Sequence, residues 1–281
     1  MKRNIQIALV ILATPLLTLP VTSQTCAEVT EYSGMCDASA AIAVGPEMFV
    51  YWITSHGTNR EGKPRPSRHR LFATEVKVAD DKVTLTPVST PYKELVKDLT
   101  KTPGLKDYKL GEAAKKPPEQ VDGLNIEGLG AAPQGALLIA FRNPIPDGKA
   151  LLVPLENPKE VVDGKAAKLG KPIPLSLGGL GVRSIEYFEA RGKYLIVAGP
   201  HSDKGNFKLY QWSGTSSEEP EPINGVNFKD LQPEALIIYS GDKKKVQVLS
   251  DDGTEQVDGK DCKDKEVKPE KKSFRSVWIT P

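Results

Sequence analysis

Four acidic residues, Asp37, Glu127, Glu186 and Glu234, stand at the start of short apolar runs. If these runs are arranged radially, their carboxylates face one axis and could together hold calcium, which takes six to eight oxygen ligands. The alternative is structural, with each carboxylate accepting hydrogen bonds from backbone N–H groups of the next sheet. We favour the structural use, because acids at strand starts commonly serve it.

The densest charge lies in the loop Thr58–Arg70. It carries one acid, Glu61, against Arg60, Lys63, Arg65, Arg68, His69 and Arg70. Guanidinium groups suit phosphate and carboxylate. The predicted contacts to a small anionic ligand are therefore Arg68, Arg70, Arg142, Arg183 and His201. The alternative, which we prefer, is a solvated loop with Arg70 paired to an acid of a neighbouring sheet.

Candidates for catalytic residues are few. Of the three histidines, His56 and His201 each follow an apolar strand and could act as a base, but no H-E-x-x-H spacing accompanies them. No G-x-S-x-G turn, P-loop or EF-hand loop occurs, and Gly179–Gly181 lacks the third glycine of a dinucleotide-binding motif. The catalytic residues, if there are any, are unknown at this point.

The elements that would position these residues are repeated hairpins, in which an acid opens an apolar run, a turn follows, and a second apolar run ends in polar residues. The pairs are Asp37–Val44 with Met48–Val50, Ile126–Leu129 with Leu137–Phe141, Ser184–Phe188 with Tyr194–Ala198, and Pro233–Tyr239 with Val246–Leu249. The distance from Glu127 to Glu186 is 59 residues and from Glu186 to Glu234 is 48, near the length of a propeller blade. The sequence thus favours an all-β propeller over a β-sandwich, although a sandwich stays open.

Other elements complete this outline. Further strands are expected at Leu71–Val78, Ala150–Pro154, Phe207–Trp212 and Val277–Thr280. Apolar residues at Tyr92, Leu95, Val96 and Leu99 have helical spacing and predict one short helix that covers a face of the sheets.

The amino terminus has the layout of a secretory signal peptide over residues 1–27. A basic start is followed by the apolar run Ile5–Leu19 and then by small and polar residues. A retained anchor, or a lipoprotein attached through Cys26, fits the residues less well. If cleavage follows Ala27, Cys36 and Cys262 remain, and an even pair in an oxidising compartment predicts a disulfide. Two unrelated thiols are the alternative.

Composition restricts the class of protein. The chain has 281 residues, of which 39% are hydrophobic, 26% charged and 6% aromatic, with 24 Gly and 23 Pro. These values are typical of a globular protein with many turns and argue against a helical bundle. The net charge is +2, and it becomes zero once Lys2 and Arg3 are removed, so nothing points to nucleic acid. We expect a single domain over residues 28–281, with no stable membrane span after signal cleavage.

Several motifs are similar to those of a bacterial family labelled domain of unknown function 3616. They are Tyr32–Ser39, Tyr51–Gly57, Ser67–Thr74, Gly123–Leu129, Phe141–Pro144, Arg183–Tyr187, Val197–His201 and Leu249–Gly253. The resemblance covers nearly all of the chain beyond residue 27. It implies an exported, propeller-like protein with no assigned reaction. The Glu-Gly-Leu step also resembles, more distantly, the phytase-like esterase propellers.

One departure from the family pattern concerns the first sheet. The resemblance implies another strand and turn before the Tyr51–Gly57 motif, but Phe49 and Val50 run directly into it. About one blade, on the order of 40 residues, is therefore expected to be missing, which leaves an incomplete or small ring.

Two functions remain open from the sequence. The first is an exported protein, periplasmic or secreted, that binds a small anionic ligand or a protein partner through loops on one face. The alternative is a calcium-dependent phosphoesterase-like hydrolase, in which the four acids hold the cation and a histidine or a water molecule moves protons.

Overall fold

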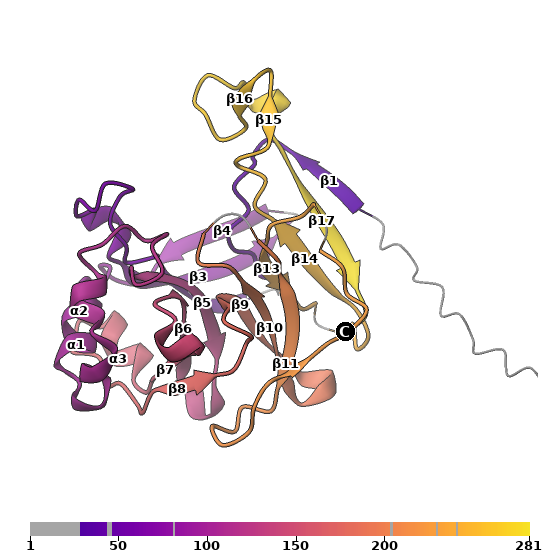
Figure 1. Ribbon diagram of the computed structural model, residues 1–281. Helices are drawn as coiled ribbons and strands as arrows, with labels where there is room; N and C mark the ends of the chain where they lie inside the picture. The colour runs from indigo at the N-terminus through magenta and orange to yellow at the C-terminus, as the bar shows by residue number, and fades with distance from the viewer. Residues whose placement is uncertain (1–28, 44–46, 81, 203–204, 229, 240) are drawn as a thin grey trace, which may run out of the picture.

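The computed structural model describes residues 29–281 except 44–46, 81, 203–204, 229 and 240. Within these residues, the long strands form four antiparallel sheets that surround a common axis (Figure 1). The architecture is a four-blade β-propeller, which confirms the predicted all-β fold and the small ring. The predicted signal peptide and Cys26 lie outside the described residues.

The first blade has three strands and the other three blades have four each, among the described residues. The blades, written from the axis outward, are β2 (Glu47–Ile53), β3 (Leu71–Ala79) and β4 (Lys82–Pro87); β5 (Asn125–Ala131), β6 (Leu137–Asn143), β7 (Ala150–Leu155) and β8 (Ile173–Leu175); β9 (Gly181–Phe188), β10 (Lys193–Gly199), β11 (Lys208–Trp212) and β12 (Glu221–Pro222); and β13 (Pro233–Ile237), β14 (Val246–Ser250), β17 (Ser273–Ile279) and β1 (Val29–Ser33). A separate small hairpin of β15 (Gln256–Val257) and β16 (Lys260–Asp261) extends away from the ring (Figure 1).

Three of the four predicted hairpins are confirmed, as β5–β6, β9–β10 and β13–β14. Their strands are buried on both faces, because each blade packs between two neighbours, so apolar runs rather than strict alternation mark them. Close packing of neighbouring blades requires a glycine at position 128. A Cβ there would lie 2.8 Å from the Cβ of Ala140 and 3.1 Å from Cγ2 of Ile185.

The first predicted hairpin is wrong. Asp37 makes only an isolated bridge to Asp251, and residues 38–43 form no strand. Met48–Val50 instead belongs to β2, which pairs with β3 and continues through the Tyr51–Ile53 motif. The first blade therefore has one strand fewer than the others among the described residues, with β2 as its innermost strand, as the shortened sequence before Tyr51 suggests.

Apolar side chains fill three of the four junctions between blades. The first cluster joins blades one and two around Leu71, Phe141 and Leu151. The second joins blades two and three, and the third joins blades three and four. At the junction between blades four and one, the described residues contribute a smaller cluster in which Ala38 packs against Ala235 and Ile237. Residues 38–43 thus cover part of the surface of β13 that a further strand of the first blade would otherwise cover.

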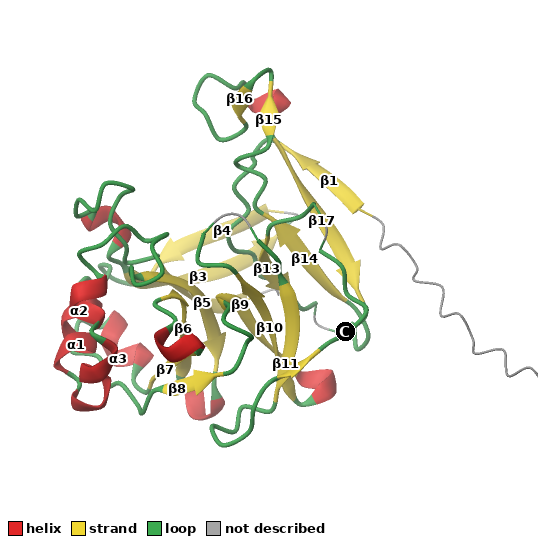
Figure 2. Cartoon of the chain, viewed as in Figure 1, coloured by secondary structure: helices red, strands yellow, loops and turns green. Residues whose placement is uncertain are grey.

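The α-helices lie together outside the ring on the side of the second blade, whereas short 3-10 turns occur elsewhere around it (Figure 2). One helix was predicted, and the described chain has three short α-helices, α1 (Leu95–Lys101), α2 (Leu110–Ala113) and α3 (Pro158–Val162). Leu95 and Leu99 are buried in the first cluster, as their spacing predicts, but Tyr92 precedes the helix and bridges Leu71. No helix in the described part of the chain is long and apolar enough to cross a bilayer.

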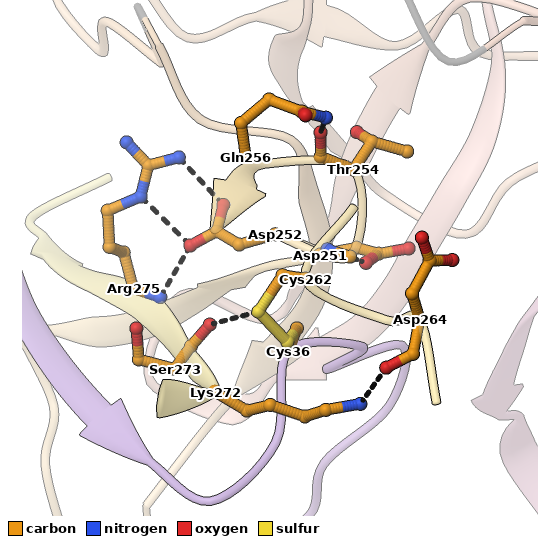
Figure 3. The surroundings of a disulfide bond; sticks show 11 residues. Cys36, Asp251, Asp252, Thr254, Gln256, Cys262, Asp264, Lys272, Ser273 and Arg275 are labelled. Carbon is orange, nitrogen blue, oxygen red and sulfur yellow. Dashed lines mark hydrogen bonds and ion pairs between the residues drawn. A yellow bond between two sulfur atoms is a disulfide. The ribbon is translucent and has the colours of Figure 1, made fainter. Parts of the chain in front are cut away.

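The two ends of the described chain close the ring together. Strand β1 pairs along its length with β17, so both lie in the last blade (Figure 1). Cys36 and Cys262 form a disulfide with a Cα–Cα distance of 6.1 Å across 226 residues of sequence, which confirms the predicted pair (Figure 3). Beside it, Arg275 binds both carboxylate oxygens of Asp252, at 2.7 and 2.9 Å.

Removing the disulfide should destabilise the ring, because the bond closes nearly the whole chain into one loop. The double variant Cys36→Ser/Cys262→Ser should lose about 3 to 5 kcal/mol in free energy of unfolding, measured by denaturant titration. The control is the unaltered protein in the same reductant-free buffer. An unchanged transition midpoint would contradict the prediction.

Candidate functional site

A cleft of about 990 Å³ opens at one end of the propeller axis. Its inner wall comes from the amino-terminal ends of β5 and β13, the last residue of β2 and the bridge between Asp37 and Asp251. Its outer wall comes from the basic loop 58–70 and from Pro118 and Glu119. The cleft therefore gathers segments that are far apart in sequence.

An ion-pair network forms the floor of the cleft. Oε1 of Glu127 lies 2.9 Å from Nη1 of Arg142, and Oε2 of Glu127 lies 3.0 Å from Nη1 of Arg183. The second terminal nitrogen of Arg183 lies 2.9 Å from Oε1 of Glu234. One guanidinium of β9 thus bridges the inner strands β5 and β13, on the two neighbouring blades.

Both arginines are almost fully buried, with 4% of Arg142 and 1% of Arg183 exposed. Their proximity depends on Gly181, because a Cβ at that position would lie 1.9 Å from the backbone oxygen of Arg142. Arg142 also donates from Nε to the backbone oxygen of Pro200, and the Arg183 guanidinium lies over the ring of Phe207. The network is therefore built into the packing of the blades.

The floor carries more carboxyl groups than guanidinium groups, and this affects their protonation. Burial and the neighbouring Glu127 carboxylate outweigh the attraction of Arg183 and raise the pKa of Glu234 to about 8. Asp37 and Asp251 also converge, since a Cβ at Gly253 would lie 1.9 Å from Oδ1 of Asp37 and 2.9 Å from Oδ1 of Asp251. Burial, and to a lesser degree Asp37, raises the pKa of Asp251.

The four acids singled out from the sequence do not share one site. Asp37, Glu127 and Glu234 line the cleft, whereas Glu186 lines a deeper pocket on the same axis. Both oxygens of Glu127 are engaged by arginine, and the described residues include no group of three His, Cys, Asp or Glu placed to hold a metal. The donors do not fit a calcium ion, and we derive no chemistry from one.

The predicted ligand-binding residues divide into two groups. Arg68 lies at the mouth of the cleft, Arg142 lies on its floor, and Arg183 is buried beneath it. Arg70 and His201 are exposed and do not line it. Neither Arg65 nor Arg68 at the mouth has a carboxylate partner among the described side chains, whereas Arg60 lies 3.6 Å from Glu119. The expected pairing of Arg70 with a sheet acid is also not found in this part of the chain.

The two histidine candidates lie outside the lining of the cleft. His56 is fully buried, with its Nδ1 2.6 Å from the backbone oxygen of Thr54, so Nδ1 carries the hydrogen and donates it. Burial lowers the pKa of His56 to about 4 and keeps the ring neutral. His201 is exposed, and its Nδ1 lies 3.0 Å from the backbone oxygen of Glu119. The geometry therefore supports neither histidine as a base that acts in the cleft.

Sequence reasoning missed Asp251, Asn125 and Lys263 as lining residues. Asp251 stood within the recognised Leu249–Gly253 motif, but only its bridge to Asp37 reveals that it faces the axis. Asn125 donates to Oε1 of Glu127 at 2.8 Å and so helps to fix that carboxylate. Its position two residues before Glu127 on a strand, on the same face, is a signal that could have found it.

These features define a small β-propeller with a charged cleft at one end of its axis. The profile of the family described as Protein of unknown function (DUF3616) matches residues 50–250, and the chain belongs to this family. A search of curated proteins finds no match.

Two solved structures are similar in part. One is a GH43 β-1,3-galactosidase with galactodeoxynojirimycin, at 13% identity and a TM-score of 0.37, with 75% of this chain and 63% of that chain covered. The other is the PQQ-bound aldose sugar dehydrogenase from Streptomyces coelicolor, at 10% identity and a TM-score of 0.37, with 83% and 76% covered. The present chain spans less than two thirds of the galactosidase chain.

Replacing Arg183 should test the importance of the floor network. The variant Arg183→Met leaves buried carboxyl groups without their counter-ion, so we expect a loss of about 3 to 5 kcal/mol and a fall in melting temperature on the order of 10 °C. The loss should shrink as the pH falls, because protonation relieves the unpaired acids. Arg191→Met, at an exposed turn, is the matched control. Equal melting temperatures for the two variants would refute this role.

The charge state of Glu186 should appear in the pH dependence of stability. Burial raises the pKa of Glu186 to about 8, so the folded protein retains a proton that the unfolded chain has lost, and stability falls as the pH rises from about 4.5 through 8. Glu186→Gln should therefore melt with the wild type near pH 5 and several degrees above it near pH 9. Glu189→Gln, at an exposed site, should follow the wild type throughout. Parallel melting curves for Glu186→Gln and wild type would overturn the assignment.

Proposed function

We propose that the protein is an exported binding protein that takes a small anionic ligand in the axial cleft. The observation that carries this proposal is the pair Arg65 and Arg68, which line the mouth of the cleft without a carboxylate partner among the described residues. Arginines in such a position bind carboxylate or phosphate through paired hydrogen bonds.

The mouth is held in place by contacts that do not involve the ligand. Arg68 donates from Nη1 to the backbone oxygen of Thr58 at 2.5 Å, and its own backbone oxygen accepts from the backbone nitrogen of His56 at 2.8 Å. Thr58 in turn donates to the backbone oxygen of Lys116. Because these bonds fix the loop, less conformational freedom is lost on binding.

The floor of the cleft supports binding of a ligand with donor groups. Arg142 and Arg183 are already engaged by Glu127 and Glu234, so the floor offers mainly carboxylate oxygens, including those of Asp37 and Asp251. A ligand with its anionic group at the mouth could place hydroxyl or amide donors against them. This distribution supports binding rather than phosphoester hydrolysis. Among the described residues that line the cleft, none is a histidine that could act as a general base.

Export is part of the proposal. It is supported by the signal-peptide layout of residues 1–27 and by the disulfide between Cys36 and Cys262, since disulfides persist in oxidising compartments such as the periplasm or the cell exterior.

The test compares two neighbouring arginines. Inorganic phosphate and citrate should each raise the melting temperature, with and without a chelator, by mass action. Arg68→Ala should weaken this effect about tenfold, whereas Arg70→Ala, two residues away and outside the cleft, should leave it unchanged. Sodium chloride at equal ionic strength is the control for screening. The proposal fails if neither anion acts beyond the salt control, or if both variants lose the effect equally.

A further inference from the structure

A second, deeper pocket of about 130 Å³ lies along the propeller axis beyond the floor of the cleft. It shares Ser39, Ala40, Ile53, Glu127 and Glu234 with the cleft, so the two spaces adjoin. All four inner strands and the unpaired segment 39–42 contribute to its wall. The pocket holds several times the ~10–15 Å³ needed for one water molecule, which gives room for a short chain of atoms.

The wall of this pocket is largely apolar. Its apolar members include Ala40, Val50, Trp52, Ile53 and Leu129. Several polar members are already engaged: Trp52 donates to Thr74, Ser184 accepts from the backbone nitrogen of Leu236, and Glu127 and Glu234 hold arginines. Because these polar groups already have partners, the wall offers few hydrogen bonds to a strongly hydrated ligand.

Glu186 is the exception in this wall. Among the described residues, its carboxyl group has neither a hydrogen-bond donor nor a cation as partner, although it projects from β9 into the pocket. Glu186 is half-buried. Withdrawing a carboxylate from water without a partner is costly, and a cation beside it would relieve that cost. Calcium does not suit the position, because it requires six or more oxygen ligands and the wall is mainly hydrocarbon.

We propose that the deeper pocket binds the ammonium group of a small aliphatic amine, with Glu186 as its counter-ion and the apolar wall around its hydrocarbon chain. This inference does not depend on anion binding in the cleft. A primary ammonium group matches one carboxylate, and an alkyl chain of a few carbons gains by leaving water for the surfaces of Val50, Ile53 and Leu129.

Binding should be linked to proton release. Burial raises the pKa of Glu186 to about 8, so near pH 7 the empty pocket holds a neutral carboxyl. When an alkylammonium ion enters, the carboxyl proton passes to the buffer and an ion pair forms. The other titratable groups lining the pocket are Tyr51 on β2, Glu127 on β5 and Glu234 on β13, while segment 39–42 contributes none. The pKa of Glu234 is also raised, but Arg183 already lies 2.9 Å from its carboxylate, so the proton release is assigned to Glu186 by the Glu186→Gln variant. Affinity should therefore rise between pH 6 and 8 and then level off.

The experiment is a calorimetric titration of the protein, without its first 27 residues, with n-butylammonium chloride. We expect millimolar binding and release of most of one proton at pH 7, obtained from buffers of different ionisation enthalpy. Sodium chloride and n-butanol at equal concentration should bind at least about tenfold more weakly, because each lacks either the alkyl chain or the charge.

Three variants make the test specific. Glu186→Gln should weaken butylammonium binding about tenfold and abolish proton release, whereas Glu189→Gln should leave both unchanged. Ala40→Phe, at an exposed position between the cleft and the pocket, should weaken binding without altering the carboxyl. Arg68→Ala should have no effect, which separates this site from the anion site. The proposal is overturned if butanol binds as well as butylammonium, or if Glu186→Gln binds normally and releases the same proton.

Discussion

The arrangement of the blades around the axis depends on one buried guanidinium. Arg183 on β9 binds Glu127 on β5 and Glu234 on β13, so a single side chain joins the inner strands of three blades. In a low-dielectric interior these charges stabilise the fold only while all are present, because removing one leaves the others buried without a partner. The same network occupies two of the four carboxylates that the sequence suggested for calcium, those of Glu127 and Glu234. The structural use of these acids therefore limits the chemistry of the cleft.

The axial space itself results from the incomplete first blade. On β5 the residues pass from the cleft into the deeper pocket as the chain proceeds, from Asn125 to Leu129. On β2 the order is reversed, since Val50 lines only the deeper pocket and Ile53 lines both. Thus β2 runs in the direction of a second strand of a blade, like β6. Residues 38–43 pack beside β13 without forming a strand, and the deeper pocket lies between part of this segment and the inner strands.

Local sequence predicted the elements where local interactions decide them. The runs around Leu137–Phe141 and Tyr194–Ala198 are bounded by turn residues on both sides, and both became central strands. Leu95 and Leu99 had helical spacing and were correctly expected to be buried. The apolar run after Asp37 was expected to form an inner strand, but residues 38–43 form none, because a strand also needs a neighbour with which to exchange backbone hydrogen bonds. No pattern within the run itself reports whether that neighbour exists.

The sequence by itself determined the fold class, three of the hairpins and the disulfide, because apolar runs, turn residues and an even pair of cysteines are local or nearly unique features. Only the tertiary structure decided which charges meet. Arg68 lies at the cleft and Arg70, two residues later, does not. Glu127 is neutralised by arginines, whereas Glu186 lines the deeper pocket without a cation partner among the described residues. The reason is physical: the protonation and binding capacity of a charged group depend on the dielectric and the counter-charges around it. Those surroundings come from blades about 50 residues apart in the chain.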